Sequence, residues 1–288
     1  MKNILLGFIL GLLVPVKLTP LLAQKTRRKE ELYTQNNKGK FFVYWGWNRA
    51  HYSSSDIHFT GSDYDFTVHD APAHDKPLKL SYNDYFRPDR VTIPQTNVRI
   101  GYFFSNHYAV SLGIDHMKYV LTNGRTAAIS GNINVTGEAS IYNGTYDRTP
   151  TLLSKDFIQF EHTDGLNYVN AEIARYDDIA KLFGWNWNTD IVQLNITEAI
   201  GAGALVPKTN ATILNRERHD DFHLSGFGIS AKAGLNLTFL KHFFIQADIK
   251  QGYINMQDIR TTQSSSDKAS QHFTFTEQTI SFGGIFRL

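Results

Sequence analysis

Histidines that adjoin carboxylates are the residues of this chain best suited to chemistry. The sequence has 11 histidines and no cysteine. An imidazole and a carboxylate together can ligate a divalent metal, or can act as a general base with the acid that orients it. The acid-flanked residues, which are the candidate metal ligands, are His69, Asp70, His74, Asp75, His219, Asp220, Asp221 and His223.

The spacing of these residues matches no strict metal motif such as His-Glu-x-x-His. Polar surface loops hold many such pairs, and carboxylates on loops can bind bridging divalent cations without any chemistry. We therefore keep both interpretations open. A divalent cation at these loops is the one cofactor that the sequence raises, and otherwise we predict none.

A serine near a histidine is the second arrangement that could be catalytic. His51 precedes Ser53 by two positions, and residues two apart share one face of a strand. Asp56 could orient the His51 ring so that it activates the hydroxyl. His162 and Asp164 form a similar pair. Two-residue coincidences of this kind are common, so these four residues, His51, Ser53, His162 and Asp164, are catalytic candidates only.

The elements that position these residues are predicted to be strands, because apolar and polar residues alternate over long stretches. Eight stretches fit, an even number that lets a sheet close on itself without edges. They are 41–52, 97–104, 107–120, 166–175, 190–206, 223–239, 243–256 and 273–288. Glu198 falls among outward apolar positions. A β-bulge or a shorter embedded stretch would explain that misfit.

The connections between these strands alternate between short and long. Two are very short, whereas those near 53–94 and 121–165 run to about forty residues each, an asymmetry typical of transmembrane barrels. The run 63–68 itself alternates, which predicts a hairpin inside the first long connection. Trp185 and Trp187 lie in a turn and are predicted to anchor at a membrane interface. Nine histidines map to the long-loop end: His51, His58, His69, His74, His116, His162, His219, His223 and His272.

The chain begins with a short basic stretch and an apolar run typical of a cleavable signal. We predict a signal peptide over 1–23, a periplasmic leader over 24–38 and an outer-membrane barrel over 39–288, in a bacterial outer membrane. The lack of cysteine excludes disulfides, thiolate metal sites and a lipoprotein anchor. The formal net charge of +2 suggests no nucleic-acid partner.

Several charged residues occupy inward positions of the predicted strands. They are Arg99, Asp115, Glu172, Lys232, Asp248, Lys250 and Glu277. An eight-stranded barrel is just wide enough for side chains to fill it, and buried charges must pair. We predict a plug of salt bridges and no open pore. A conduction pathway or a proton relay is the alternative.

The architecture resembles the small outer-membrane β-barrels typified by OmpA, OmpX and PagP, and most of all the barrel proteins of Bacteroidota. The stretches that carry the resemblance are 46–50, 160–167 and 201–203, and the alternating C-terminal strand ends on Leu288 where Phe is usual. The resemblance implies an all-β, up-and-down transmembrane barrel inserted by the barrel-assembly machinery, in contact with lipid and lipopolysaccharide.

Three functions fit these features. The first is a non-enzymatic barrel whose ordered extracellular loops bind a partner, or which serves as an accessory subunit of a larger outer-membrane complex. The second is an enzyme that acylates or deacylates lipid A with His and acid residues of the loops. The third is a channel for small solutes.

Overall fold

The structure is a computed structural model that describes residues 32–79, 81–85, 87, 94–216 and 218–288. The predicted signal peptide and residues 24–31 of the predicted leader lie outside the described residues. Leu32–Leu288 forms one compact unit.

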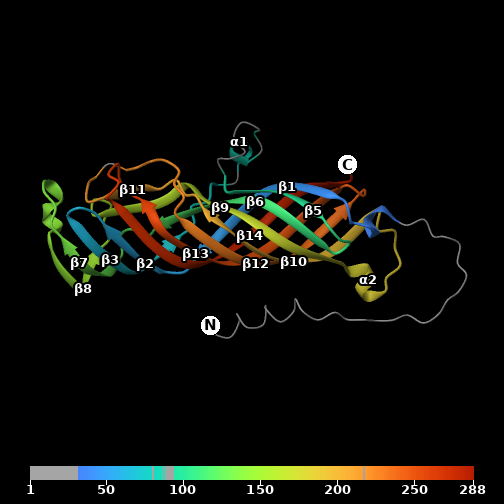
Figure 1. The fold of residues 1–288 in the computed structure, drawn as a ribbon, viewed down its shortest axis with the longest axis horizontal. Helices are drawn as coiled ribbons and strands as arrows, with labels where there is room; N and C mark the ends of the chain where they lie inside the picture. The colour runs from blue at the N-terminus through green and yellow to red at the C-terminus, as the bar shows by residue number, and fades with distance from the viewer. Residues whose placement is uncertain (1–31, 80, 86, 88–93, 217) are drawn as a thin grey trace, which may run out of the picture. The chain divides into compact units, whose positions relative to one another are not determined.

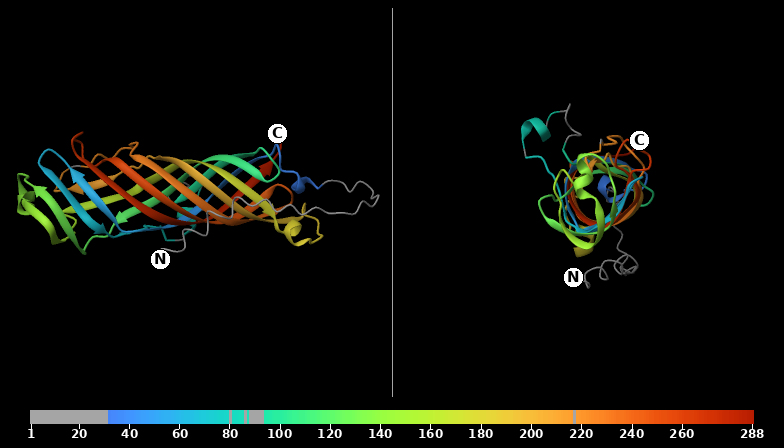
Figure 2. Two further views of the ribbon diagram at one scale, coloured as in Figure 1. Left: turned by 60° about the horizontal axis from the view of Figure 1, so that its bottom comes forward. Right: turned by 90° about the vertical axis from the view of Figure 1, so that its left-hand side faces the viewer.

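Eight antiparallel strands of this unit close into a ring, which Figure 2 shows end-on. The last strand pairs with the first, from Phe41↔Phe286 to Tyr52↔Phe275. The predicted all-β barrel of eight strands is therefore confirmed. In the order of the ring, the strands are β1 (Phe41–Tyr52), β5 (Thr96–Phe103), β6 (Tyr108–Leu121), β9 (Ile158–Asp178), β10 (Val192–Leu205), β12 (Gly226–Phe239), β13 (Phe243–Arg260) and β14 (Lys268–Phe286).

Each strand has one face inside the ring and one outside, as the alternation predicted. Along β1, Phe42, Tyr44 and Asn48 are buried, while their neighbours are half-buried or exposed. Glu198 faces outward without a bulge, since β10 pairs in unbroken register with β12 and β9 around it. The predicted β-bulge at Glu198 was therefore wrong. Glu198 lies directly across from Arg175 of β9, an opposite charge on the same face.

The long connections contain strands rather than open loops. β2 (Ser55–Thr60), β3 (Tyr64–Ala71), β7 (Thr126–Ile133) and β8 (Gly144–Leu152) add in that order to one end of β14. The predicted hairpin near 63–68 is present as the β2–β3 pair. β4 (Ala73–His74) pairs with β6, and β11 (Asn210–Ile213) pairs with β9. We call residues 53–79, 117–166, 206–225 and 256–273 the β extension; β7 and β8 lie at its far end (Figure 1).

The helical segments among the described residues are few and short. They are η2 (Tyr33–Gln35), α1 (Tyr82–Tyr85), η4 (Glu138–Tyr142) and α2 (Ile179–Phe183). α2 sits in the turn between β9 and β10, capped by Asp178 at its start and by Gly184 in a left-handed conformation at its end. Within the part of the chain that the structure describes, no helix is long and apolar enough to cross a membrane.

The interior of the ring is layered along its axis. Near the short turns, an aromatic cluster includes Phe42, Phe103, Tyr176 and Phe244. Inside the β extension lies a larger apolar core around Phe59, which the next subsection describes. The inward charged residues lie between these two apolar clusters. On β6, for example, Asp115 lies between Ala109 of the first cluster and Met117 of the second. The barrel therefore has an apolar plug at each end and a charged layer in its middle.

Candidate functional site

The inward charged residues form a compact layer. Seven side chains from six strands meet there, and all are at most 8% exposed. We call them the charge layer: Arg99, Asp115, Glu172, Lys232, Asp248, Lys250 and Glu277. Side chains that lined a water-filled passage would be exposed, and these seven side chains are buried.

Glu172 is at the centre of the charge layer. Its carboxylate lies 2.7 Å from the Lys232 ammonium, 3.0 Å from Lys250 and 3.1 Å from the Arg99 guanidinium. The three cations come from β12, β13 and β5, which are distant in sequence. The Lys232 contact is a charge-assisted hydrogen bond, which is among the stronger polar contacts in proteins, whereas Lys250 and Arg99 form ion pairs with the other carboxylate oxygen. Glu172 therefore ties four strands together through one side chain.

Asp115 and Asp248 are two further acids of the layer. Asp115 pairs with Lys250 and also accepts hydrogen bonds from the amides of Asn97 (2.7 Å) and Asn170 (2.9 Å). Asp248 accepts from Gln246 at 2.9 Å and 3.0 Å and lies 4.0 Å from the Lys232 ammonium. Amide donors thus supplement the cations where the ion pairs alone would leave oxygens unsatisfied.

Glu277 has neither the hydrogen bonds at both oxygens that Asp115 and Asp248 have nor the close cations of Glu172. One of its oxygens accepts from Asn97 at 2.9 Å, but the other has no hydrogen-bond partner and lies 3.8 Å from the Lys250 ammonium. The layer holds four carboxyls and three cations, so full ionisation would leave one buried negative charge uncompensated. Glu277 is the carboxyl best placed to carry a proton instead.

Two glycines make room for the largest charged side chains. A Cβ on Gly113 would lie 2.9 Å from the Arg99 guanidinium carbon, and a Cβ on Gly201 would lie 2.8 Å from the Glu172 side chain. Any side chain at either position would collide with the ion pairs. Gly201 and Gly113 thus have a packing role, because a residue without a side chain leaves space for a larger neighbour.

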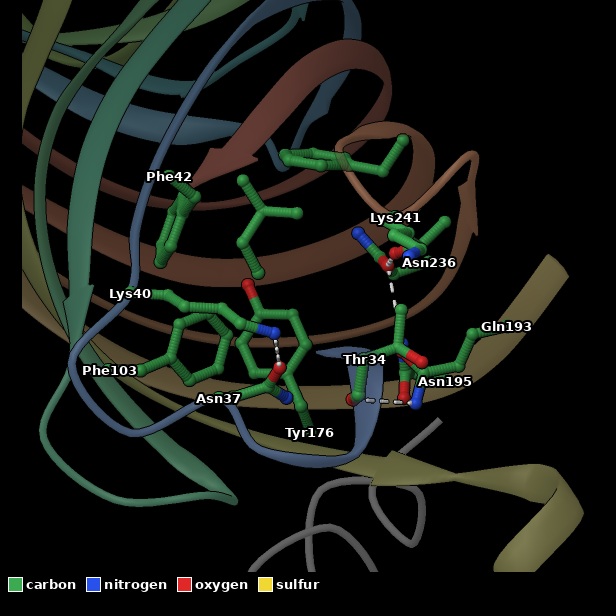
Figure 3. Close-up of a pocket in the computed structure, with 13 residues that line it drawn as sticks. Thr34, Asn37, Lys40, Phe42, Phe103, Tyr176, Gln193, Asn195, Asn236 and Lys241 are labelled. Carbon is green, nitrogen blue, oxygen red and sulfur yellow. Dashed lines mark hydrogen bonds between the residues drawn. The ribbon is translucent and has the colours of Figure 1, made fainter. Parts of the chain in front are cut away.

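The short-turn end of the barrel is closed by the start of the described chain. Thr34 is buried and donates its hydroxyl to Asp190, while its backbone N–H donates to the same carboxylate at 2.9 Å. The Lys40 ammonium donates to the carbonyl of Tyr33 at 2.7 Å, and burial lowers the pKa of Lys40 to about 8. Between these residues lies a cavity of about 20 Å³, shown in Figure 3. That volume suits about one water molecule.

The candidate metal ligands do not converge. His69 contacts Asp56 (3.0 Å) and Ser130, and His74 contacts Thr122 (2.8 Å). The other six candidate ligands have separate partners as well. Asp220 pairs with Arg218 and His223 with Asp258, while Asp75 and Asp221 accept from the backbone amides of Ala50 and Phe222. The backbone amides of Asp70 and His219 donate to Asp56 and to the Thr261 carbonyl. Among the described residues, no group of three or more His, Asp and Glu could hold a metal ion.

The catalytic candidates do not form the predicted pairs either. His51 and Ser53 are exposed, and Ser53 accepts a hydrogen bond from the Thr274 backbone amide rather than from His51. His162 is completely buried, whereas Asp164 is exposed. His162 instead contacts Thr209 (3.0 Å) and Gln271 (3.3 Å). The two-residue spacing did not predict these contacts, because β9 is irregular near Gly165, where φ is +135°.

Burial changes the chemistry of His162 in the β extension. Its ring packs beside Phe160 and Tyr119, with centroids 4.9 Å and 5.6 Å away. Burial without a nearby acid lowers the pKa of His162 to about 3. The imidazole is therefore neutral and part of the apolar core at neutral pH.

That core is a substantial one. Phe59 packs against Phe66 and Phe160, with ring centroids 5.3 Å and 5.5 Å apart, and all three are at most 1% exposed. Other buried members from the extension are Ile57, Val68, Met117, Tyr119, Leu121, Ile129, Leu153, Phe157, Ile158, Ile213, Met256 and Ile259. The aromatics Tyr64 and Phe66 of the first long connection thus serve this core.

β8 was not predicted, and it is the least covered strand of the sheet. Seven of its nine residues are exposed and the other two are half-buried. It pairs with β7 on one side and ends the strand order on the other. Its sequence, Gly-Thr-Tyr-Asp-Arg-Thr-Pro-Thr-Leu, lacks an apolar face, so alternation could not reveal it. The β-branched threonines were the available signal.

No family model and no curated protein matches this chain. Several solved outer-membrane proteins are similar to it in structure. OprG from Pseudomonas aeruginosa is 9% identical with a TM-score of 0.39, covering 90% of this chain and 100% of that protein. Ail, the attachment invasion locus protein of Yersinia pestis, is 11% identical with a TM-score of 0.31, covering 86% and 99%. At these values the likeness carries no argument about function, and the Bacteroidota affinity stays a prediction.

Proposed function

We propose that this protein is an integral outer-membrane barrel that is sealed to solutes and binds a partner protein through its β extension. The membrane placement is supported by the outer wall, which is apolar over all eight strands. A soluble monomer rarely exposes so large an apolar surface. Its exposed large side chains include Val43, Val98, Ile100, Val110, Leu112, Ile114, Val169, Ile173, Val192, Ile200, Phe227, Ile229, Leu235, Ile249, Ile280 and Phe282.

The orientation follows from the connections. Transmembrane barrels have short turns on the periplasmic side and long connections outside the cell. The turn around α2 adds exposed aromatics, Phe183, Trp185 and Trp187, whose rings pack on one another. Such residues favour the membrane–water interface. The β extension would then face the cell exterior.

The exposed edge of β8 carries the partner-binding proposal. A strand at the edge of a sheet presents unpaired backbone groups that can pair with an extended segment of another protein. β8 is paired with β7, which contributes Ile129 and Ile133 to the apolar core, so the edge is already extended before a partner binds. Pro150 lacks an N–H and Arg148 has a φ of +46°, and both interrupt continuous pairing along the edge. Such interruptions discourage self-aggregation and favour a specific partner.

The alternative functions gain no support from the placement of their residues. Lipid A modification needs a nucleophile or metal near a base, and the candidate residues do not meet. Passage of small solutes needs a solvent-accessible lumen, and the side chains of the charge layer are buried. Both alternatives stay predictions without a supporting site.

The test is photo-crosslinking in native outer membranes. A photoreactive amino acid replaces Leu152 or Asp147, both exposed on β8, in separate full-length variants. The control places the same amino acid at Asp65, which is exposed on β3, a strand paired on both sides. We expect one discrete protein adduct from the β8 positions and none from Asp65. Equal adducts at all three positions, or none on β8, would contradict the proposal.

A further inference from the structure

A groove lies on the outer wall where β10 ends and β12 begins, and the loop that precedes β12 also lines it. Its volume is about 450 Å³, within the range of sites that hold small ligands. Phe227 and Ala204 lie across from each other on its floor, and Leu224 lies beside them. Leu224 and Phe227 are 62% and 51% exposed. The other lining residues are Gly203, Ser225, Gly226, Asn255 and Gln257.

The groove lies at the border of the apolar wall. One row of outward residues crosses six strands through direct pairings, and its members change from apolar to polar along the row. In order they are Ile114, Val169, Ala204, Phe227, Asn255 and His272. The groove occupies the point of change, with Phe227 on the apolar side and Asn255 on the polar side.

The loop over the groove is held in place by its backbone. The amide of His223 donates to Pro207 at 3.1 Å and that of Ser225 to Leu205 at 2.9 Å. The carbonyl of Ser225 accepts from Gln257 at 2.9 Å. His223 also pairs with Asp258 at 3.0 Å. Leu224 is therefore exposed on a fixed backbone, and not because the loop is loose.

We propose that this groove binds an acyl chain of an outer-leaflet membrane lipid. Large apolar side chains fixed at the rim of a lipid-facing wall are stabilised by covering them with hydrocarbon. The polar end of the groove, at Ser225, Asn255 and Gln257, is chemically suited to the ester or amide region where an acyl chain begins. The inference rests on the proposed membrane placement and is independent of partner binding at β8.

The experiment uses the full mature chain in vesicles of phosphatidylethanolamine and phosphatidylglycerol that contain a phosphatidylcholine with a diazirine in one acyl chain. After irradiation, the labelled residues are mapped by mass spectrometry. Ala204→Trp fills the groove. Ala231→Trp, at an outward position of β12 away from the groove, is the matched control. Both variants are checked for insertion by protease protection.

We expect labelling to concentrate on Leu224 and Phe227, and to fall about tenfold there in Ala204→Trp but not in Ala231→Trp. Equal labelling of Phe227, Ile229 and Leu235 in the unmodified chain would overturn the groove while leaving the membrane placement intact. No labelling anywhere on the wall would overturn both. The map of the unmodified chain decides the matter even if a tryptophan variant fails to insert.

Discussion

The barrel and the β extension share one antiparallel sheet, yet the middle of the barrel has a charged interior and the extension an apolar one. In the middle of the barrel, past the aromatic cluster at the short-turn end, the interior is the charge layer around Glu172. Inside the β extension, it is an apolar core around Phe59 and Phe160. The outer faces are reversed as well: the barrel presents Ile100 and Leu112, while the extension presents His58 and Asp65.

The surroundings explain this reversal. Turning apolar side chains from lipid into the barrel would add little stability, because lipid is as apolar as a protein core. Ion pairs and hydrogen bonds must then hold its interior. The extension stands in water under the proposed function, so burying apolar side chains stabilises it directly. Polar contacts thus stabilise the middle of the barrel, and apolar burial stabilises the β extension next to it.

Loss of the central carboxylate should have the largest effect. Glu172→Gln leaves three buried cations around a neutral group, and breaking a buried ion pair from one side costs about 3–5 kcal/mol. We expect a drop of that order in the free energy of unfolding, measured by urea titration of the barrel in lipid vesicles.

Glu277→Gln is the matched control, since it alters the same layer at the acid inferred to be protonated already. Its amide oxygen can still accept from Asn97, so a loss of about 1 kcal/mol or less is expected. If the two variants are equally destabilised, the charge layer is not organised around Glu172.

Phe160→Ala should act on the extension alone. Removing a buried phenyl ring from a core costs about 3–5 kcal/mol, and Phe160 packs at the centre of that core. Hydrogen exchange should show faster exchange in β2, β3 and β11, with protection of β10 and β12 unchanged. Loss of protection throughout the barrel would show that the two regions unfold together.

Acid should also distinguish the two regions, with a smaller effect near neutral pH. The pKa of His162 is about 3 in the folded chain, below its unfolded value of about 6.5. The unfolded state therefore binds the extra proton between these values, and folding weakens as pH falls from about 6.5 toward 3. Between these two pKa values, the free energy of unfolding falls by about 1.4 kcal/mol for each pH unit of acidification.

Hydrogen exchange of the extension at pH 7 and pH 5 measures this effect. His162→Gln removes the titrating group while keeping a polar side chain, so the difference between the two pH values should shrink. An unchanged pH dependence in that variant would assign the acid sensitivity to another group.

The alternation of residues predicted the eight barrel strands and their order, because a period of two follows directly from strand geometry. It also predicted which charged residues face inward. The predictions failed where contacts depend on distant segments. β8 has no apolar face, so alternation could not predict it. The candidate metal ligands are adjacent in sequence, but in the described structure they contact different partners.

What the sequence alone determined is therefore the period-two pattern: eight strands, an apolar outer wall, and seven charged residues on inward positions. Only the tertiary structure decided that Arg99, Lys232 and Lys250 meet at Glu172, that His162 is enclosed in a second core, and that a groove opens beside Leu224. The reason is physical. Alternation is a local property of each strand, whereas these contacts depend on the pairing register between strands and on how the long connections fold over the barrel.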